Sequence, residues 1–119
     1  MASDAWIVSS GRVLASAKVV TGRRERRRGL LGRDDFDGAL VLPHCRWIHT
    51  IGMKFSIDAA YLDETQRVIK VDGVGRNRFC APVRQAVTVI EARRGAFERW
   101  GLHQGDILEV RSATESSRR

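Results

Sequence analysis

The sequence has little of what would cross-link, export or anchor a small protein. Its 119 residues include only two cysteines, Cys45 and Cys80. Two cysteines cannot form a disulfide framework, so we expect free thiols, and one disulfide only if the chain is exported. No apolar run approaches the roughly 20 residues that a membrane helix needs. The first 20 residues lack a basic stretch and a continuous apolar stretch, so they do not resemble a signal peptide. We therefore expect a cytoplasmic protein without a transmembrane segment.

Internal repeats and dividing linkers are also absent. A chain of this length most often forms one domain and can bury a core without cross-links. We predict a single globular domain over residues 1–111. Residues 112–119, SATESSRR, are polar and lack hydrophobic periodicity, which is typical of a flexible tail.

Positive charge dominates the composition. The formal net charge is +7 and the isoelectric point is about 10.7, so polyanions such as nucleic acid are candidate partners. Much of the excess lies in one run, which we predict to form a basic helix face: Arg23, Arg24, Arg26, Arg27 and Arg28. The run is more typical of a solvated helix face, although it remains the best electrostatic patch in the sequence. Arg76, Arg78 and Arg84 could extend it, but few aromatic residues interleave with these arginines, which argues against a single-strand binder that stacks bases.

The hydrophobic pattern predicts a β-rich α+β fold. Short apolar or alternating runs indicate strands at residues 6–9, 13–20, 39–42, 55–62, 67–74, 86–92 and 106–110. Two short helices are expected, near residues 23–29 and 95–101, each followed by glycine. Hairpin-length connections favour a compact, mainly antiparallel sheet or a small, partly open barrel.

The segment HTIGMKFSIDAAYLD, residues 49–63, combines polar residues with a strand pattern. Its second half alternates, with Phe55 and Ile57 on one face and Asp58 on the other. The alternation continues after the turn at 63–66, so residues 55–74 are predicted to form a β-hairpin. A carboxylate in mid-strand is costly unless it is paired. Asp58 is therefore either a structural hydrogen-bond acceptor, which we favour, or a catalytic base or metal ligand.

Histidine and cysteine gather just before this segment. In HCRWIH, the residues His44, Cys45 and His49 are potential zinc ligands, with Cys80 or Asp58 available to complete a site. However, there is no CxxC pair, and we expect neither metal nor cofactor. His49 and Asp58 are the candidate catalytic residues of an alternative hydrolytic or metal-dependent enzyme. A thiol triad with either cysteine is a further alternative.

Two other groups of residues are candidates for binding or for a turn. If Trp47, His49 and Phe79 meet, they would form a ligand site; Trp47 otherwise belongs with Phe97 and Trp100 as a packing residue. The predicted ligand-binding set is Trp47, His49, Thr50, Met53, Lys54 and Asp58. Gly105 and Asp106 precede the last strand and are predicted to form a structural turn in which Asp106 accepts hydrogen bonds from local amides.

Four stretches of the sequence resemble domain-of-unknown-function family 192, a group of small prokaryotic domains. They are RGLLGR, GALVLP, HTIGMKFSIDAAYLD and VIEARRGAFERWGLHQGDILEV, within residues 12–111. The most distinctive matches are Met53, Lys54, Ile57 and Asp58. Ser56, where the family usually has proline, and Gly52, where many members have tryptophan, depart from the pattern. The resemblance implies a compact β-rich fold with short helices and no established activity.

The sequence therefore favours a non-enzymatic binding or accessory module whose ligand is an unidentified small molecule or protein. The alternatives are the His49–Asp58 enzyme and polyanion binding through the Arg23–Arg28 face.

Overall fold

The computed structural model describes residues 2–20 and 37–112. The helix predicted at residues 23–29, with its five arginines, lies outside the described residues, as do residues 113–119 of the predicted tail. Within the described ranges no helix is both long enough and apolar enough to span a membrane.

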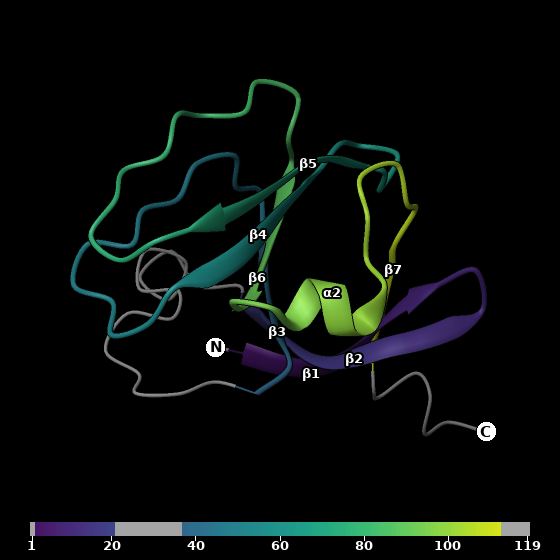
Figure 1. The fold of residues 1–119 in the computed structure, drawn as a ribbon. Coiled ribbons are helices and arrows are strands. Elements are labelled where there is room, and N and C mark those ends of the chain that lie inside the picture. Colours follow the sequence, from purple (N-terminus) through teal and green to yellow (C-terminus); the bar gives the residue numbers. More distant parts are fainter. Residues whose placement is uncertain (1, 21–36, 113–119) are drawn as a thin grey trace.

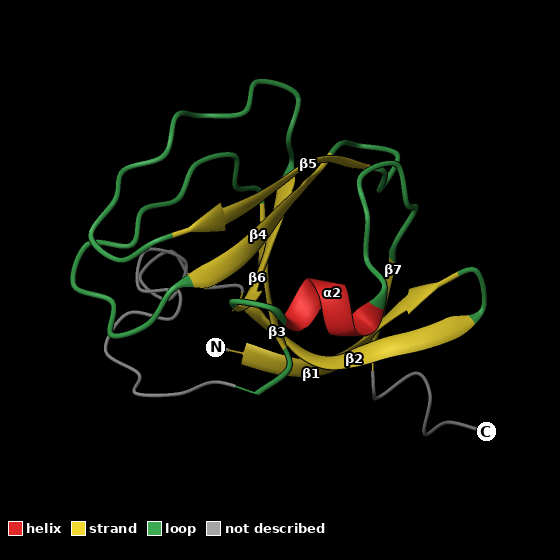
Figure 2. Ribbon diagram, viewed as in Figure 1, coloured by secondary structure: helices red, strands yellow, loops and turns green. Residues whose placement is uncertain are grey.

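Seven strands and one short helix make up the described fold (Figures 1 and 2). The strands are β1 (Ala2–Ser9), β2 (Arg12–Val20), β3 (Ala39–Pro43), β4 (Ile57–Leu62), β5 (Val68–Val74), β6 (Thr88–Arg93) and β7 (Glu109–Ser112). They form one sheet in the order β5-β4-β6-β3-β2-β1-β7. The helix α2 (Ala96–Trp100) lies between β6 and β7 in the chain.

The predicted β-rich fold is confirmed, but the described architecture differs from the prediction in strand direction and in closure. The sheet is mixed rather than antiparallel, because β2 and β3 pair in parallel. Hydrophobic alternation does not reveal the direction in which a strand returns after a long connection, so the sequence could not show this pairing. The sheet is also not closed into a barrel, and α2 is the one helix within the described ranges.

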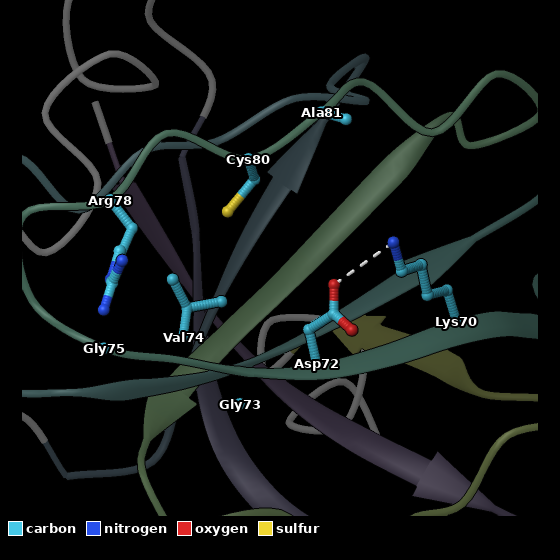
Figure 3. A pocket seen from close by; sticks show the side chains of 8 residues that line it. All are labelled: Lys70, Asp72, Gly73, Val74, Gly75, Arg78, Cys80 and Ala81. Atoms are coloured by element: carbon cyan, nitrogen blue, oxygen red, sulfur yellow. Dashed lines mark ion pairs between the residues drawn. The ribbon is translucent and has the colours of Figure 1, made fainter.

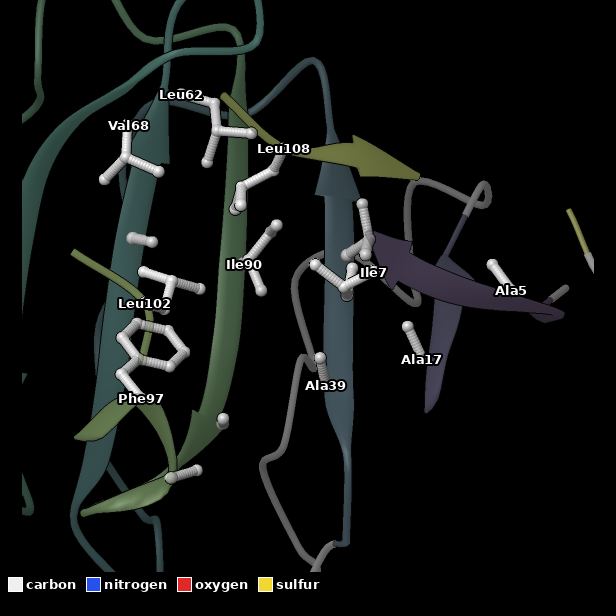
Figure 4. Close-up of a cluster of buried hydrophobic side chains, with 14 residues drawn as sticks. Ala5, Ile7, Ala17, Ala39, Leu62, Val68, Ile90, Phe97, Leu102 and Leu108 are labelled. Carbon is white, nitrogen blue, oxygen red and sulfur yellow. The ribbon is translucent and has the colours of Figure 1, made fainter. Parts of the chain in front are cut away.

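The central strands β3, β4 and β6 are buried on both faces. One face, which we call the helix face, packs Leu62, Ile90 and Leu108 against Phe97 of α2 (Figure 4). The other, which we call the loop face, contains Leu40, Leu42, Ile57 and Tyr61. Alternation assigns the residues of β4 to these faces as predicted, with Ile57, Ala59 and Tyr61 on one and Ala60 and Leu62 on the other.

A turn near the C-terminus joins the two ends of the sheet. Gly105 has a positive φ of 97°, and its N–H donates to the Val68 carbonyl. The Asp106 carboxylate accepts a hydrogen bond of 2.7 Å from the His103 N–H, the local role that aspartate takes in turns. This turn connects the start of β5 to the segment before β7.

Candidate functional site

Two irregular segments cover the loop face of the sheet. Residues 44–56 follow β3, and residues 75–87 follow β5; they lie side by side at the upper left of Figure 1. His49 and Phe79 form an antiparallel bridge between them. We call these two segments together the paired loops.

Thr50 fixes the paired loops to each other. Its side chain is fully buried. The hydroxyl donates to the Gly75 carbonyl at 2.6 Å and accepts from the Arg78 N–H at 2.9 Å. The Thr50 N–H donates to the Arg78 carbonyl, and the Thr50 carbonyl accepts from Met53 and Asn77. Because these groups are satisfied internally, Thr50 stabilises the surface rather than facing a ligand.

Three aromatic rings meet on the outer side of the paired loops. The ring centroids of Trp47 and Phe79 are 6.3 Å apart with an interplanar angle of 25°, which is a stacked arrangement. The His49 ring lies 5.5 Å from Trp47 and 5.7 Å from Phe79. Phe79 is 73% exposed and Trp47 is 42% exposed. We call these three residues the aromatic cluster.

The charges of the paired loops have one sign. The segments contain five cationic residues and no aspartate or glutamate: Arg46, Lys54, Arg76, Arg78 and Arg84. All five are exposed. The sequence indicated that few aromatic residues interleave with the arginines; in these loops Trp47 and Phe79 are both exposed. The sequence left Trp47 between packing and ligand binding, because residue type alone does not show whether a tryptophan in a loop faces solvent.

The other predicted ligand-binding residues take different positions. Met53 is buried in the core of the loop face. Lys54 is exposed on the first of the paired loops. The backbone N–H of Ile51 donates to His49 Nδ1 at 3.2 Å. That hydrogen bond orients the imidazole ring. Because Nδ1 is occupied as an acceptor, Nε2 is the ring nitrogen that can hydrogen-bond to a ligand.

Asp58 lies on the helix face, where it caps α2. One carboxylate oxygen accepts hydrogen bonds from the Gly95 N–H at 2.9 Å and the Phe97 N–H at 3.1 Å. The other oxygen lies 4.0 Å from the Arg94 guanidinium. A carboxylate from β4 thus satisfies amides that the first turn of α2 cannot bond itself.

We expect Asp58→Ala to lower the free energy of unfolding by about 1–2 kcal/mol, because two helix-end amides lose their acceptor. Asp58→Asn keeps an acceptor oxygen and is expected to retain most of the stability. Urea denaturation of both variants measures the difference. Equal losses in the two variants would contradict a capping role.

The two candidate catalytic residues do not come together. His49 belongs to the loops over one face of the sheet, whereas Asp58 contacts α2 on the opposite face. Cys45 and Cys80 form no disulfide with each other, and the Cys45 thiol donates to the Trp47 carbonyl. Among the described residues, no group of three or more His, Cys, Asp or Glu side chains is placed to hold a metal ion.

Three titratable groups with raised pKa values, two in the sheet and one in the second of the paired loops, were not singled out as a group from the sequence. Glu91 is 4% exposed, and burial raises its pKa to about 7. Burial also raises the pKa of the Cys80 thiol and of the Tyr61 hydroxyl. The Tyr61 hydroxyl is buried and has no hydrogen-bond partner among the described residues.

Comparisons with known proteins agree on the fold. The sequence pattern of DUF192, described as an uncharacterized ACR, matches residues 6–110. A protein of unknown function from Novosphingobium aromaticivorans superposes with a TM-score of 0.75 at 14% identity, over 91% of this chain and 84% of that one. A candidate transcription regulator from Sinorhizobium meliloti superposes with a TM-score of 0.74 at 16% identity, over 92% of this chain and 94% of that one. No curated protein matches the sequence. At these identities the structural likeness establishes the fold alone.

Proposed function

Since the chain belongs to the DUF192 family, which is described as uncharacterized, we propose a function from the site itself: a non-enzymatic module that binds single-stranded nucleic acid through the paired loops. The observation that carries this proposal is the aromatic cluster, exposed on loops whose five charged side chains are all cationic.

The aromatic cluster supplies the stacking surface. Monomeric proteins seldom gather large exposed apolar side chains without an interaction to serve. Besides Trp47 and Phe79, the paired loops expose Ile51 and Val87. Stacking on an aromatic ring suits every base, because each base has a π face, and it requires no groove-reading helix. Double-stranded nucleic acid keeps its bases stacked inside the helix and cannot use these rings in this way.

The cations supply the electrostatic part. Phosphates repel carboxylates, so a surface of this kind needs cationic residues without intervening acidic ones. The paired loops meet that requirement over two segments far apart in sequence. The hydrogen bonds of Thr50 hold the two segments in one arrangement before binding, which reduces the entropy lost on ordering.

Binding is expected to depend strongly on salt. If all five cations neutralise phosphates, the logarithm of the association constant should fall with the logarithm of salt concentration with a slope of about −3.5. That slope corresponds to a loss of roughly 100-fold between 50 and 200 mM salt. Fluorescence anisotropy with a labelled 12-nucleotide oligothymidylate measures it, with Arg84→Gln expected to reduce the slope by about 0.7.

A control separates this surface from the Arg23–Arg28 run. Charge reversal in Arg26→Glu/Arg27→Glu leaves the paired loops intact, so the proposal predicts that the preference for single strands persists. A dissociation constant that does not change with salt, or equal affinity for single and double strands, would overturn the proposal.

A further inference from the structure

A hollow lies between β5 and the loop that follows it. It has a volume of about 400 Å³, within the range of small-molecule sites. One wall is β5, through Lys70, Asp72, Gly73 and Val74, and the other is the following loop, through Gly75, Arg78, Cys80 and Ala81 (Figure 3). We call this hollow the β5 cavity.

Strand alternation explains the wall formed by β5. Lys70, Asp72 and Val74 are two residues apart, so their side chains share one face of the strand. Lys70 pairs across the sheet with Tyr61, and Val74 with Ile57, two residues of the loop-face core. The chain then turns back, so that Cys80 and Arg78 face this wall (Figure 3).

The two cationic side chains of the β5 cavity differ in their acidic partners. Lys70 Nζ lies 3.4 Å from Asp72 Oδ2, and it also lies 5.9 Å from the centre of the Tyr61 ring. Across the cavity, no acidic side chain in the described ranges forms an ion pair with Arg78. Val74, Ala81 and the Cys80 sulfur supply apolar surface between the two cations.

A buried polar group, the Tyr61 hydroxyl, neighbours residues that line the β5 cavity. The Tyr61 residue is fully buried, and its hydroxyl has no hydrogen-bond partner among the described residues. The hydroxyl interacts electrostatically with Cys80 and Asp72, both of which line the cavity. The Cys80 thiol is at most a weak hydrogen-bond partner for this hydroxyl, so the buried group adds polarity behind the cavity wall.

We propose that the β5 cavity binds a small organic oxyanion, a carboxylate or a phosphate ester, held between Arg78 and Lys70 with its apolar part on Val74 and Ala81. Arg78 provides a planar fork that matches both kinds of oxyanion. Asp72 disfavours a second negative charge near Lys70, so the anionic group lies toward Arg78.

The test is a titration of the full chain with butyrate and, separately, with inorganic phosphate, followed by backbone amide NMR. We expect saturable shifts at Gly73, Gly75, Cys80 and Ala81 with at least one probe, and a dissociation constant near or below about 1 mM. Lys70→Gln and Arg78→Gln should each weaken binding at least tenfold. Arg84→Gln, on the same loop but outside the cavity, should bind as the wild type does. Binding of butyrate alone would indicate a carboxylate ligand, and binding of phosphate alone would indicate a phosphate ester. Binding of both would indicate that the cavity accepts either oxyanion.

A second readout uses the thiols. Bound ligand should slow the alkylation of Cys80 by iodoacetamide and leave the rate for Cys45 unchanged. Shifts that spread to residues 44–56 and 82–87, equal weakening in Arg84→Gln, or no saturation by either probe would overturn the proposal. The outcome is separable from that for nucleic acid, because Trp47→Ala/Phe79→Ala should retain oxyanion binding and Lys70→Gln should retain oligothymidylate binding.

Discussion

Replacing Trp47 and Phe79 by alanine should nearly abolish binding of single-stranded oligonucleotides. Each base stacked on an aromatic ring contributes about 1–3 kcal/mol, so each substitution should weaken binding between about 5-fold and about 150-fold. Because both rings are substantially exposed, their removal creates no core cavity and should change stability little. Fluorescence anisotropy at 50 mM salt gives the affinities, and thermal unfolding checks the fold.

The chain contains a matched control for this experiment. Trp6, on β1, is 40% exposed, close to the 42% of Trp47, but it lies outside the paired loops. Trp6→Ala removes the same side chain from an equally exposed position and should leave affinity unchanged. If Trp6→Ala weakens binding as much as Trp47→Ala does, the aromatic cluster is not the binding surface.

The stability of the protein should fall as pH rises from about 4.5 to about 7, and Glu91 should account for a large part of the loss. Burial raises the pKa of Glu91 from 4.5 to about 7 in the folded protein. The folded state therefore keeps a proton that the unfolded state releases near pH 4.5. Stability from this group is fully present below pH 4.5 and is lost as pH rises through 7. The difference corresponds to about 3 kcal/mol.

Glu91→Gln isolates this contribution, because glutamine has a similar shape and does not titrate. The free energy of unfolding, measured by urea denaturation between pH 4 and 8, should show a smaller decline in the variant, so that the gap between the two proteins changes by about 3 kcal/mol. Glu91 lies between Leu40 of β3 and Ala59 of β4, so neighbours on both strands are apolar. Parallel pH profiles for the two proteins would contradict burial of an ionisable Glu91.

The strands, and the face of the sheet on which each side chain lies, could be predicted because the alternation of apolar and polar residues is a local property of the sequence. The β4–β5 hairpin and the two faces of β4 follow from a period of two. The parallel pairing of β2 with β3 could not, because it depends on how the chain returns after residue 20. Direction across a long connection is a tertiary property and has no signature in either strand.

The candidate site was predictable in part. Trp47 and His49 were identified, and the suggestion that they meet Phe79 agrees with the ring contacts. Thr50 and Met53 were both predicted to bind a ligand, yet both are buried. Their burial depends on residues 75–80, which are far away in sequence. The β5 cavity was missed for the same reason, although the spacing of Lys70, Asp72 and Val74 placed those three side chains on one face.

The most direct test of the central claim is ultraviolet cross-linking of the full chain to oligothymidylate, followed by mass spectrometry of the cross-linked peptides. Binding through the paired loops predicts cross-links at Trp47, His49 or Phe79, in peptides from residues 44–56 and 75–87. Cross-links confined to the Arg23–Arg28 segment, or none at concentrations that saturate binding, would contradict the claim that these loops are the nucleic-acid surface.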